Sequence, residues 1–261
     1  MNKRQEELLK RLHLKGMVEI SEEANFFGVS GMTIRRDIRL LAKAGKVLIT
    51  LKGAVPRSDV HEQAAASPPT PEKMAIAERA LQLLKEEFPE TKSIMLSTGS
   101  TVLEFSKLLA REDLPIAVLT NSLTVATTLF GCKTKVMLTG GELRNNSLDL
   151  IGPAAEQSLA NYHVDILFTG CDGADAMQGF FYTADLNLAN LENQSVKIAQ
   201  TTVVLTTCDK FDRRSLARFA NSSDIDYVIT DRELTAEKKK MLATNGIKPL
   251  FSDPNELLKL K

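Results

Sequence analysis

Two sets of side chains in this sequence have the types and spacing needed to bind anions. The first is a run of arginines between Val29 and Lys46, where they recur on one side of a predicted helix. Guanidinium groups bind phosphates and the edges of guanine bases. The second is a loop with one glycine between hydroxyl residues, Thr98-Gly99-Ser100-Thr101, which opens another predicted helix. Backbone N–H groups at such a helix start can hold a phosphate.

The arginine-containing segment predicts a short helix between two boundary residues. Ser30 is a suitable N-cap, and Gly45 stands where the helix would end. Ile34, Ile38 and Leu41 recur at helical spacing, so they would form one buried stripe. By the helical repeat, the opposite side carries the remaining long side chains. These are Met32, Arg35, Arg36, Arg39 and Lys43.

The residues before this helix decide between two interpretations of it. A charged outer face is also normal for a solvated amphipathic helix. However, 6–14 predicts a first helix, 17–20 a short extended piece, and 21–27 a second helix capped by Ser21. Gly28-Val29 then makes a tight turn before the basic helix. This order is that of a helix-turn-helix, so we predict binding of double-stranded DNA.

Composition describes an ordinary globular chain with an uneven charge distribution. Of 261 residues, 43% are hydrophobic and 25% are charged, and the formal net charge is zero. Residues 1–57 carry 12 Lys+Arg against 6 Asp+Glu, a net +6, so the remainder carries 21 against 27, a net −6. A basic head on an acidic body fits a DNA-binding domain joined to a domain that avoids DNA.

Several classes of protein are not indicated by the sequence. No apolar run is long enough to cross a membrane, and the first residues lead directly into an amphipathic helix rather than a signal peptide. We therefore expect a cytoplasmic protein. The three cysteines, Cys132, Cys171 and Cys208, form no Cys-x-x-Cys pair, so free thiols are expected instead of a metal site or a disulfide.

The chain changes character after Pro56. The proline-containing stretch up to Pro71 has no large apolar periodicity and predicts a linker, and helical periodicity resumes over 72–87. From Ser93 onward, continuous apolar strands alternate with helices, which is typical of a parallel sheet covered on both faces. The strands are expected at 93–96, 116–119, 135–138, 164–168, 202–205, 227–229 and 247–251. The helices between them are expected at 101–110, 122–130, 153–160, 186–200 and 235–244.

These patterns predict an α/β protein with three parts. Residues 1–57 would form a small helix-turn-helix domain, 58–72 a linker, and 73–261 a larger α/β domain with a parallel sheet. Ligands of such sheets lie at the carboxyl ends of the strands. Those ends are rich in glycine and small polar residues, and we expect them to converge on one pocket. They are 97–101, 120–122, 139–142, 169–175 and 206–211.

The first of these strand ends has the clearest chemistry. Thr98, Ser100 and Thr101 add hydroxyl donors to the N–H groups around Gly99, and Lys210 could supply a cation from across the rim. The loop is neither a Walker A motif nor a dinucleotide-binding Gly-x-Gly-x-x-Gly. We therefore predict a phosphate-sized anion site without a nucleotide cofactor or a metal.

Residues 4–57 resemble the N-terminal domain of the DeoR family of bacterial repressors. The family signature Val-Ser-x-x-Thr-Ile-Arg-Arg-Asp-Leu stands here as Val-Ser-Gly-Met-Thr-Ile-Arg-Arg-Asp-Ile at 29–38. The family follows it with a β-wing ending in Arg-x-His-Gly-Gly-Ala, where this chain has Ile-Thr-Leu-Lys-Gly-Ala at 49–54. The resemblance implies that the helix contacts DNA through Ser30, Met32, Thr33, Arg35, Arg36, Arg39 and Lys43.

The second half resembles the sensor domain of the same family, which is similar to ribose-5-phosphate isomerase in fold and binds phosphorylated sugars. Together the two resemblances imply that 1–57 is a winged helix-turn-helix DNA-binding domain and that 73–261 is a parallel-sheet α/β sugar-phosphate sensor and oligomerisation domain. The matching pieces are Thr98-Gly99-Ser100-Thr101, Thr120-Asn121-Ser122, Gly140-Gly141, Gly170-x-Asp172-Gly173 and Lys210-Phe211. The ligand-binding residues that this implies are Thr98, Gly99, Ser100, Thr101, Asn121, Ser122, Gly140, Gly141, Asp172, Gly173 and Lys210.

The chain departs from the family pattern at four places near this predicted site. Ser97 stands where the family usually has Asp, and Thr207 begins a changed Asp-x-Ser-Lys-Phe motif. Leu188 and Glu192 stand where an acidic residue and then a lysine are common. These changes keep the phosphate cradle but alter the groups around the sugar, so the effector could differ or be lost.

Three functions remain open from the sequence. The leading one is a DNA-binding transcriptional regulator, most simply a repressor of carbohydrate genes, whose DNA affinity is modulated by a phosphorylated sugar. It would act as a homodimer or homotetramer on operator DNA, away from membranes and without catalytic residues. A sugar-phosphate isomerase with a fused DNA-binding head would use Asp172 and Asp175 as acid and base. A constitutive DNA binder with a vestigial pocket is the third.

Overall fold

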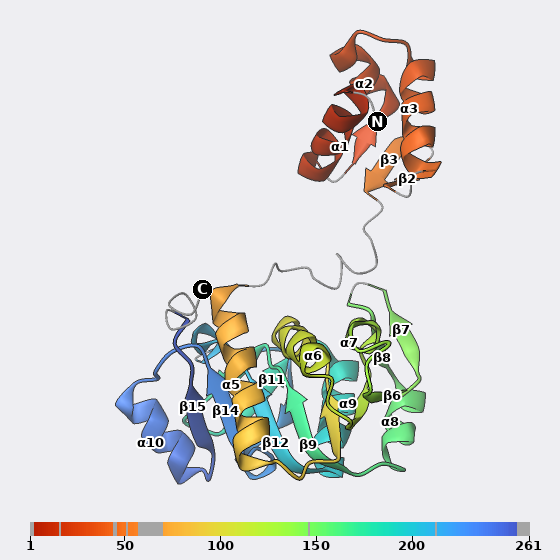
Figure 1. The fold of residues 1–261 in the computed structure, drawn as a ribbon. Coiled ribbons are helices and arrows are strands. Elements are labelled where there is room, and N and C mark those ends of the chain that lie inside the picture. Colours follow the sequence, from red (N-terminus) through yellow and green to blue (C-terminus); the bar gives the residue numbers. More distant parts are fainter. Residues whose placement is uncertain are drawn as a thin grey trace. The chain divides into compact units, whose positions relative to one another are not determined.

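A computed structural model gives the arrangement of most of the chain (Figure 1). It describes residues 3–15, 17–43, 46–50, 52–56, 70–145, 147–211 and 213–254. Contacts divide the chain into two units, Met1–Gln63 and Ala64–Lys261. Each unit has its own hydrophobic core and is described by itself.

The N-terminal unit is a small helical domain with a three-stranded antiparallel sheet. Its elements are α1 (Lys3–Lys15), β1 (Val18–Glu19), α2 (Ile20–Phe27), α3 (Gly31–Lys43), β2 (Val47–Ile49) and β3 (Gly53–Pro56). The strands are ordered β1-β3-β2, so β2 and β3 form a wing after the basic helix. The predicted winged helix-turn-helix order is confirmed.

The predicted apolar stripe of α3 forms the centre of this unit. Ile34, Ile38 and Leu41 are at most 2% exposed and pack with Leu8 and Leu12 of α1. Burial of these side chains is the main favourable term that holds the basic helix on its domain.

The start of α3 is as expected, whereas the start of α2 is not. The Ser30 hydroxyl accepts a hydrogen bond from the Thr33 backbone N–H at 3.2 Å, so Ser30 is the N-cap. Ser21 was expected to cap α2, but the helix begins at Ile20 with Glu19 at the N-cap. The reason is that β1 pairs with β3 through Glu19, and the Ile20 N–H bonds to the Lys52 carbonyl, which leaves no separate capping residue. Gly45, the expected helix stop, lies outside the described residues.

The larger unit contains a seven-stranded parallel sheet, which confirms the predicted α/β class. The order is β15-β14-β12-β9-β4-β5-β6. The strands are β4 (Ser93–Leu96), β5 (Ala117–Thr120), β6 (Lys135–Leu138), β9 (Val164–Thr169), β12 (Ala199–Leu205), β14 (Tyr227–Thr230) and β15 (Lys248–Phe251). The central strands each contain a buried apolar run, as expected of strands covered on both faces. These runs are 94–96 in β4, 166–168 in β9 and 203–205 in β12.

Helices cover both faces of this sheet (Figure 1). They are α5 (Pro71–Glu87), α6 (Ser100–Glu112), α7 (Leu123–Thr128), α8 (Pro153–Leu159), α9 (Leu186–Ile198) and α10 (Ala236–Thr244). Alternate residues of β4 separate the two cores, because Ile94 packs with Ile76 of α5 and Phe105 of α6, whereas Met95 packs with Leu159 of α8 and Leu191 of α9.

Several short antiparallel strands were not predicted. β7 (Glu142–Arg144) and β8 (Asp149–Ile151) form a hairpin. β10 (Gly173–Asp175), β11 (Phe180–Thr183) and β13 (Ala217–Ala220) form a small separate sheet. Strands of three or four residues are too short to show a clear hydrophobic period, so the sequence pattern resembles that of loops.

Two predicted boundaries are corrected. α5 begins at Pro71 with Thr70 as its N-cap, because proline is well suited to the first helical turn, so Pro71 and Glu72 belong to the helix and not to the expected linker over 58–72. α9 ends at Ile198, and Ala199 and Gln200 belong to β12 instead of extending the helix. The rest of the expected linker, from 58 to 69, lies outside the described residues. None of the helices in the described ranges is long and apolar enough to span a membrane.

Gly53 permits the close approach of β1 and β3. A Cβ at this position would lie 1.8 Å from the Val18 carbonyl oxygen. We expect Gly53→Ala to displace β1 and destabilise the N-terminal unit by about 2 kcal/mol or more. Hydrogen exchange should become faster in β1 and β3 but not in β4.

Gly31→Ala is the matched control, since its Cβ would meet only the Cγ2 methyl group of Ile20, at 3.3 Å. Equal exchange of the wing in both variants would contradict the steric role of Gly53.

Candidate functional site

The outer face of α3 carries the predicted DNA-contacting residues. Arg35, Arg36 and Arg39 are exposed, and Met32 is 68% exposed. At the start of the helix, the hydroxyls of Ser30 and Thr33 are hydrogen-bonded to each other at 2.9 Å. The side chain of Lys43, the last residue of α3, lies outside what the structure describes. The described side chains therefore form one cationic face opposite the buried stripe.

A buried carboxylate fixes this face relative to the first helix. Asp37 lies on the inner side of α3 and is 3% exposed. It accepts hydrogen bonds from Arg4 Nε at 2.6 Å and from Gln5 Nε2 at 2.9 Å, both in α1. Sequence reasoning did not single out Asp37, although its place among the apolar positions of the helix was a usable signal. A cavity at this junction is lined by Arg4, Gln5, Ser30, Met32, Thr33, Arg36, Asp37, Arg39 and Leu40.

The wing is present although its sequence departs from the expected signature. The Thr50 N–H donates to the Gly53 carbonyl at 3.0 Å, and the Gly53 N–H donates to the Thr50 hydroxyl at 3.1 Å. These bonds close the turn between β2 and β3, where Lys52 is exposed. The wing thus offers one lysine where the family pattern has other residues.

In the second unit, a pocket lies where the chain order of the parallel sheet reverses. The chain proceeds from β4 to β5 and β6 on one side, and from β9 to β12, β14 and β15 on the other. Such a switch point leaves a crevice at the carboxyl ends of the two central strands. The pocket is lined by Thr98, Gly99, Ser100, Thr101, Val102, Arg144, Ser147, Gly170, Cys171, Asp172, Thr183, Leu188, Glu192, Leu205 and Lys210.

The predicted anion cradle lies in this pocket. Gly99 is the N-cap of α6 and has φ of 131°, a conformation that favours glycine. It has no side chain to cap the helix, so the first-turn N–H groups and the dipole face the pocket together with Ser100 and Thr101.

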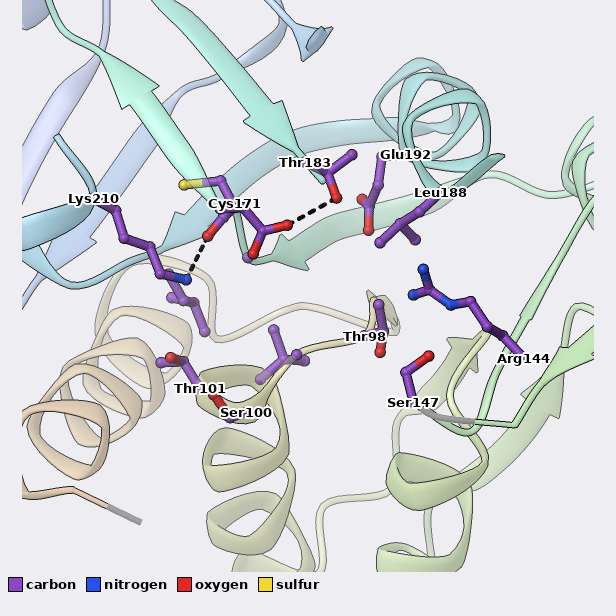
Figure 2. A pocket seen from close by; sticks show the side chains of 15 residues that line it. Thr98, Ser100, Thr101, Arg144, Ser147, Cys171, Thr183, Leu188, Glu192 and Lys210 are labelled. Atoms are coloured by element: carbon purple, nitrogen blue, oxygen red, sulfur yellow. Dashed lines mark hydrogen bonds between the residues drawn. The ribbon is translucent and has the colours of Figure 1, made fainter. Parts of the chain in front are cut away.

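Lys210 lies at the same end of the pocket as Ser100 and Thr101 (Figure 2). Lys210 Nζ donates a hydrogen bond to the Cys171 carbonyl at 2.5 Å. Burial and then the positive charge of Lys210 lower the pKa of the Lys73 ammonium on α5. Lys73 is not among the residues predicted from the sequence. Two lysines whose charges repel each other create a positive potential that an anion would relieve.

Asp172 lines the pocket, but Asp175 does not. Asp172 accepts hydrogen bonds from the Thr183 hydroxyl at 3.1 Å and from the Ala184 N–H at 2.8 Å. Asp175 instead pairs with Arg214 at 2.8 Å and accepts from the backbone of the following turn. The two candidate acid–base groups of the enzyme hypothesis are thus not brought together at the cavity.

The expectation that all the strand ends converge on one pocket is wrong. The ends of β5 and β6 are covered by the β7–β8 hairpin, so Asn121, Ser122, Gly140 and Gly141 do not line the cavity. Asn121 is fully buried and its amide donates to Leu150 in β8. Ser122 caps α7 by accepting from the Val125 N–H at 3.3 Å.

The glycines at these places have packing roles. A Cβ on Gly141 would lie 2.6 Å from the Ile151 carbonyl oxygen, and one on Gly173 would lie 2.2 Å from the Arg213 carbonyl oxygen. Gly140 has φ of 71° in the same turn. Gly173 also stays outside the pocket lining. The residues matched to the family therefore include some that line the pocket and others, such as these glycines, that only allow the surrounding backbone to pack closely.

The hairpin contributes an arginine that the sequence analysis missed. Arg144 in β7 forms a two-pronged ion pair with buried Asp149, with Nε–Oδ1 at 2.9 Å and Nη2–Oδ2 at 2.5 Å. Its Nη1 also lies 3.2 Å from Asp185 at the start of α9. The hydrogen bonds that Arg144 donates to Asp149 raise the pKa of the Arg144 guanidinium. No sequence signal was available, because β7 was not predicted.

Glu192 and Ser97, noted as departures from the family pattern, are in direct contact. The Ser97 hydroxyl donates to Glu192 Oε1, and the Thr169 hydroxyl donates to Oε2 at 2.8 Å. Burial raises the pKa of Glu192 to about 7, in spite of these hydrogen bonds. Leu188, one turn earlier in α9, lines the pocket beside it (Figure 2).

The cysteines match the expectation of free thiols. Cys171 is buried, whereas Cys132 and Cys208 are half-buried, and all are free. Within the described part of the chain, no group of three or more His, Cys, Asp and Glu side chains could hold a metal ion.

Asp37 provides a test of how the basic face is fixed. Asp37→Ala removes a buried acceptor and leaves Arg4 without its carboxylate. We expect the N-terminal unit to lose about 2 kcal/mol of stability, and hydrogen exchange in α1 and α3 to accelerate. Glu6→Ala, which removes an exposed carboxylate from the same unit, should have little effect. Equal effects of the two substitutions would show that the Asp37 contacts are dispensable.

Models of known protein families match both units of the chain. Residues 4–59 match the DeoR-like helix-turn-helix domain, and residues 69–232 match the DeoR C terminal sensor domain. The putative aga operon transcriptional repressor of Escherichia coli O157:H7 is 30% identical, covering 96% of this chain and 93% of the relative. The glycerol-3-phosphate regulon repressor of Escherichia coli K12 is 28% identical, covering 86% and 87%.

A solved structure, ribose 5-phosphate isomerase A from Methanocaldococcus jannaschii, is similar over 53% of each chain with 21% identity and a TM-score of 0.39. The sequence relatives, by contrast, extend over both units of the chain. Because both domain models match the two units in order, this chain belongs to the DeoR family and is a DNA-binding transcriptional regulator.

Proposed function

We propose that this protein represses genes of carbohydrate metabolism and releases its operator when a phosphorylated sugar occupies the sensor pocket. The observation that carries the proposal is the presence in one chain of an outward arginine face on α3 and a helix-start anion cradle in the pocket. We place its action in the cytoplasm, where operator DNA lies.

The proposed DNA contacts come from the exposed side of α3. Arg35, Arg36 and Arg39 would bind phosphates and guanine edges, and Met32 would contact bases through its apolar side chain. Ser30 and Thr33 at the helix start would meet a phosphate near the positive end of the helix. Lys43 keeps its proposed role from the sequence. Because operators are two-fold symmetric, we propose a homodimer or homotetramer.

We propose that fewer residues contact the effector than the family resemblance implied. Thr98, Gly99, Ser100, Thr101 and Lys210 would hold the phosphate, and Asp172 would accept from sugar hydroxyls. Asn121, Ser122, Gly140, Gly141 and Gly173 would support the frame of the pocket without touching the ligand. Relatives named as repressors of the aga operon and of the glycerol-3-phosphate regulon support a carbohydrate-related effector.

We infer a sensor instead of a catalyst for the same pocket. An isomerase would need an acid and a base close to one substrate. Asp175, the second candidate, is turned to Arg214 and outside the pocket lining.

The helix assignment predicts a loss of DNA binding on substitution. Arg35→Ala and Arg36→Ala should each weaken binding by about tenfold or more, because each removes a charge-assisted contact. The measurement is a mobility shift on a duplex selected from random DNA by the unaltered protein. Arg111→Ala, an exposed position on α6, is the control. Binding equal to that of the control in both variants would remove the assignment of α3.

The pocket assignment predicts a loss of phosphosugar binding. Lys210→Met should weaken calorimetric binding of phosphorylated sugars by about tenfold, because it removes a cation facing the cradle. Lys197→Met, an exposed substitution on α9, should leave that affinity unchanged. Absence of heat from every phosphorylated sugar with the unaltered protein would instead support a vestigial pocket and a constitutive DNA binder.

A further inference from the structure

The end of the pocket opposite Lys210 contains a buried carboxyl group without a cationic partner (Figure 2). Glu192 lines the pocket and is 4% exposed. Each of its oxygens accepts one hydroxyl hydrogen bond, from Ser97 and from Thr169. A carboxylate oxygen has capacity for a second hydrogen bond. Among the described residues, no lysine, arginine or histidine forms an ion pair with Glu192.

The charged groups around Glu192 are predominantly acidic. Arg144 lies at this end, but its guanidinium is already paired with Asp149 and Asp185. Asp149 and Asp172 place further negative charge nearby, which adds to the effect of burial on the Glu192 pKa. One arginine is thus surrounded by four carboxyl groups, those of Glu192, Asp149, Asp172 and Asp185. A buried negative charge in such surroundings is unfavourable until a cation joins it.

The opposite end of the same cavity carries positive charge. The α6 start and Lys210 face it with positive potential, as required for a phosphate. The pocket is therefore bipolar, cationic at the cradle and anionic at Glu192. A ligand with charges of both signs matches this arrangement better than one that carries only a phosphate.

We propose that the sensor pocket selects a phosphorylated amino sugar, whose ammonium group pairs with Glu192 while its phosphate occupies the α6 cradle. This inference rests on the proposed phosphosugar function and specifies its ligand. The ammonium supplies the missing counter-charge and donates to the free lone pairs of the carboxylate. A neutral hydroxyl at the same place supplies no counter-charge, so it gives Glu192 no reason to lose its proton.

The first test compares ligands that differ only in this group. Calorimetry would use glucosamine 6-phosphate against glucose 6-phosphate, and galactosamine 6-phosphate against galactose 6-phosphate, on the full chain. We expect at least one amino member to bind about tenfold or more tightly than its hydroxyl partner. Equal or weaker binding of both amino members, or no binding by either, overturns the inference.

The outcome also separates this inference from the proposed function. Binding of the hydroxyl members alone would leave a phosphosugar sensor standing without an ammonium site. Absence of binding by all four compounds and by inorganic phosphate would overturn both proposals.

The second test substitutes the carboxyl group by its neutral isostere. Glu192→Gln retains hydrogen-bonding capacity toward Ser97 and Thr169 but cannot become negative, so the preference for the amino member should disappear. Glu237→Gln, an exposed change on α10, should keep the preference. Thermal unfolding of both variants verifies that they fold. A preference that persists in folded Glu192→Gln overturns the assignment.

The third test detects the proton on Glu192. Its pKa lies at about 7 without ligand, and a bound ammonium would lower it. Near pH 6.5, binding of the amino member should therefore release more protons than binding of its hydroxyl partner, as measured in buffers of different ionisation enthalpy. The phosphate is the same in both ligands, and both ligands meet the same other charged groups of the pocket, so the proton release that these groups cause cancels in the comparison. These groups are Arg144, Asp149, Asp172, Asp185 and Lys210. Equal proton release, or an equal difference in Glu192→Gln, contradicts the pairing.

Discussion

The structure of the DNA-binding unit depends on burial of one side of α3. Ile34, Ile38 and Leu41 are enclosed by α1 and the wing, which fixes the rotation of the helix about its axis. With that rotation fixed, the arginines can only face outward. Asp37 adds a directional restraint, because its bonds to Arg4 and Gln5 also set the position of α1 along α3. The apolar stripe, Ile34, Ile38 and Leu41, thus positions the cationic face from inside the domain.

A comparable constraint positions the pocket of the second unit. A parallel sheet covered by helices on both faces leaves the strand ends as the places where loops can form a cavity. The reversal of chain order between β4 and β9 opens the crevice there, and the β4–α6 loop brings a helix start to it. The same geometry gives the pocket its polarity, since α6 and Lys210 approach from one end and α9, with Glu192, from the other.

Local sequence pattern was enough to predict elements that are long or strongly periodic. The α3 stripe, the Ser30 cap and the central strands belong to this group, as do the cradle residues Thr98 to Thr101, which directly follow a buried strand. The β7–β8 hairpin could not be predicted, because its strands are short and stabilised by long-range contacts. Because the hairpin was not predicted, neither the position of Arg144 nor the burial of Asn121 beneath β8 could be predicted. Glu192 was noticed only as a departure, because its burial depends on how α9 packs on β4 and β9.

We propose that occupation of the pocket and binding of DNA oppose each other through a shared free energy of coupling. Such coupling is reciprocal, so the effector must weaken DNA binding by the same factor by which DNA weakens effector binding. The most direct measurement is calorimetric titration of a bound phosphorylated sugar into the protein alone and into its operator complex. We predict weaker sugar binding in the complex, by the factor seen in mobility shifts with the sugar present. Sugar affinity that is the same with and without operator DNA would contradict the account.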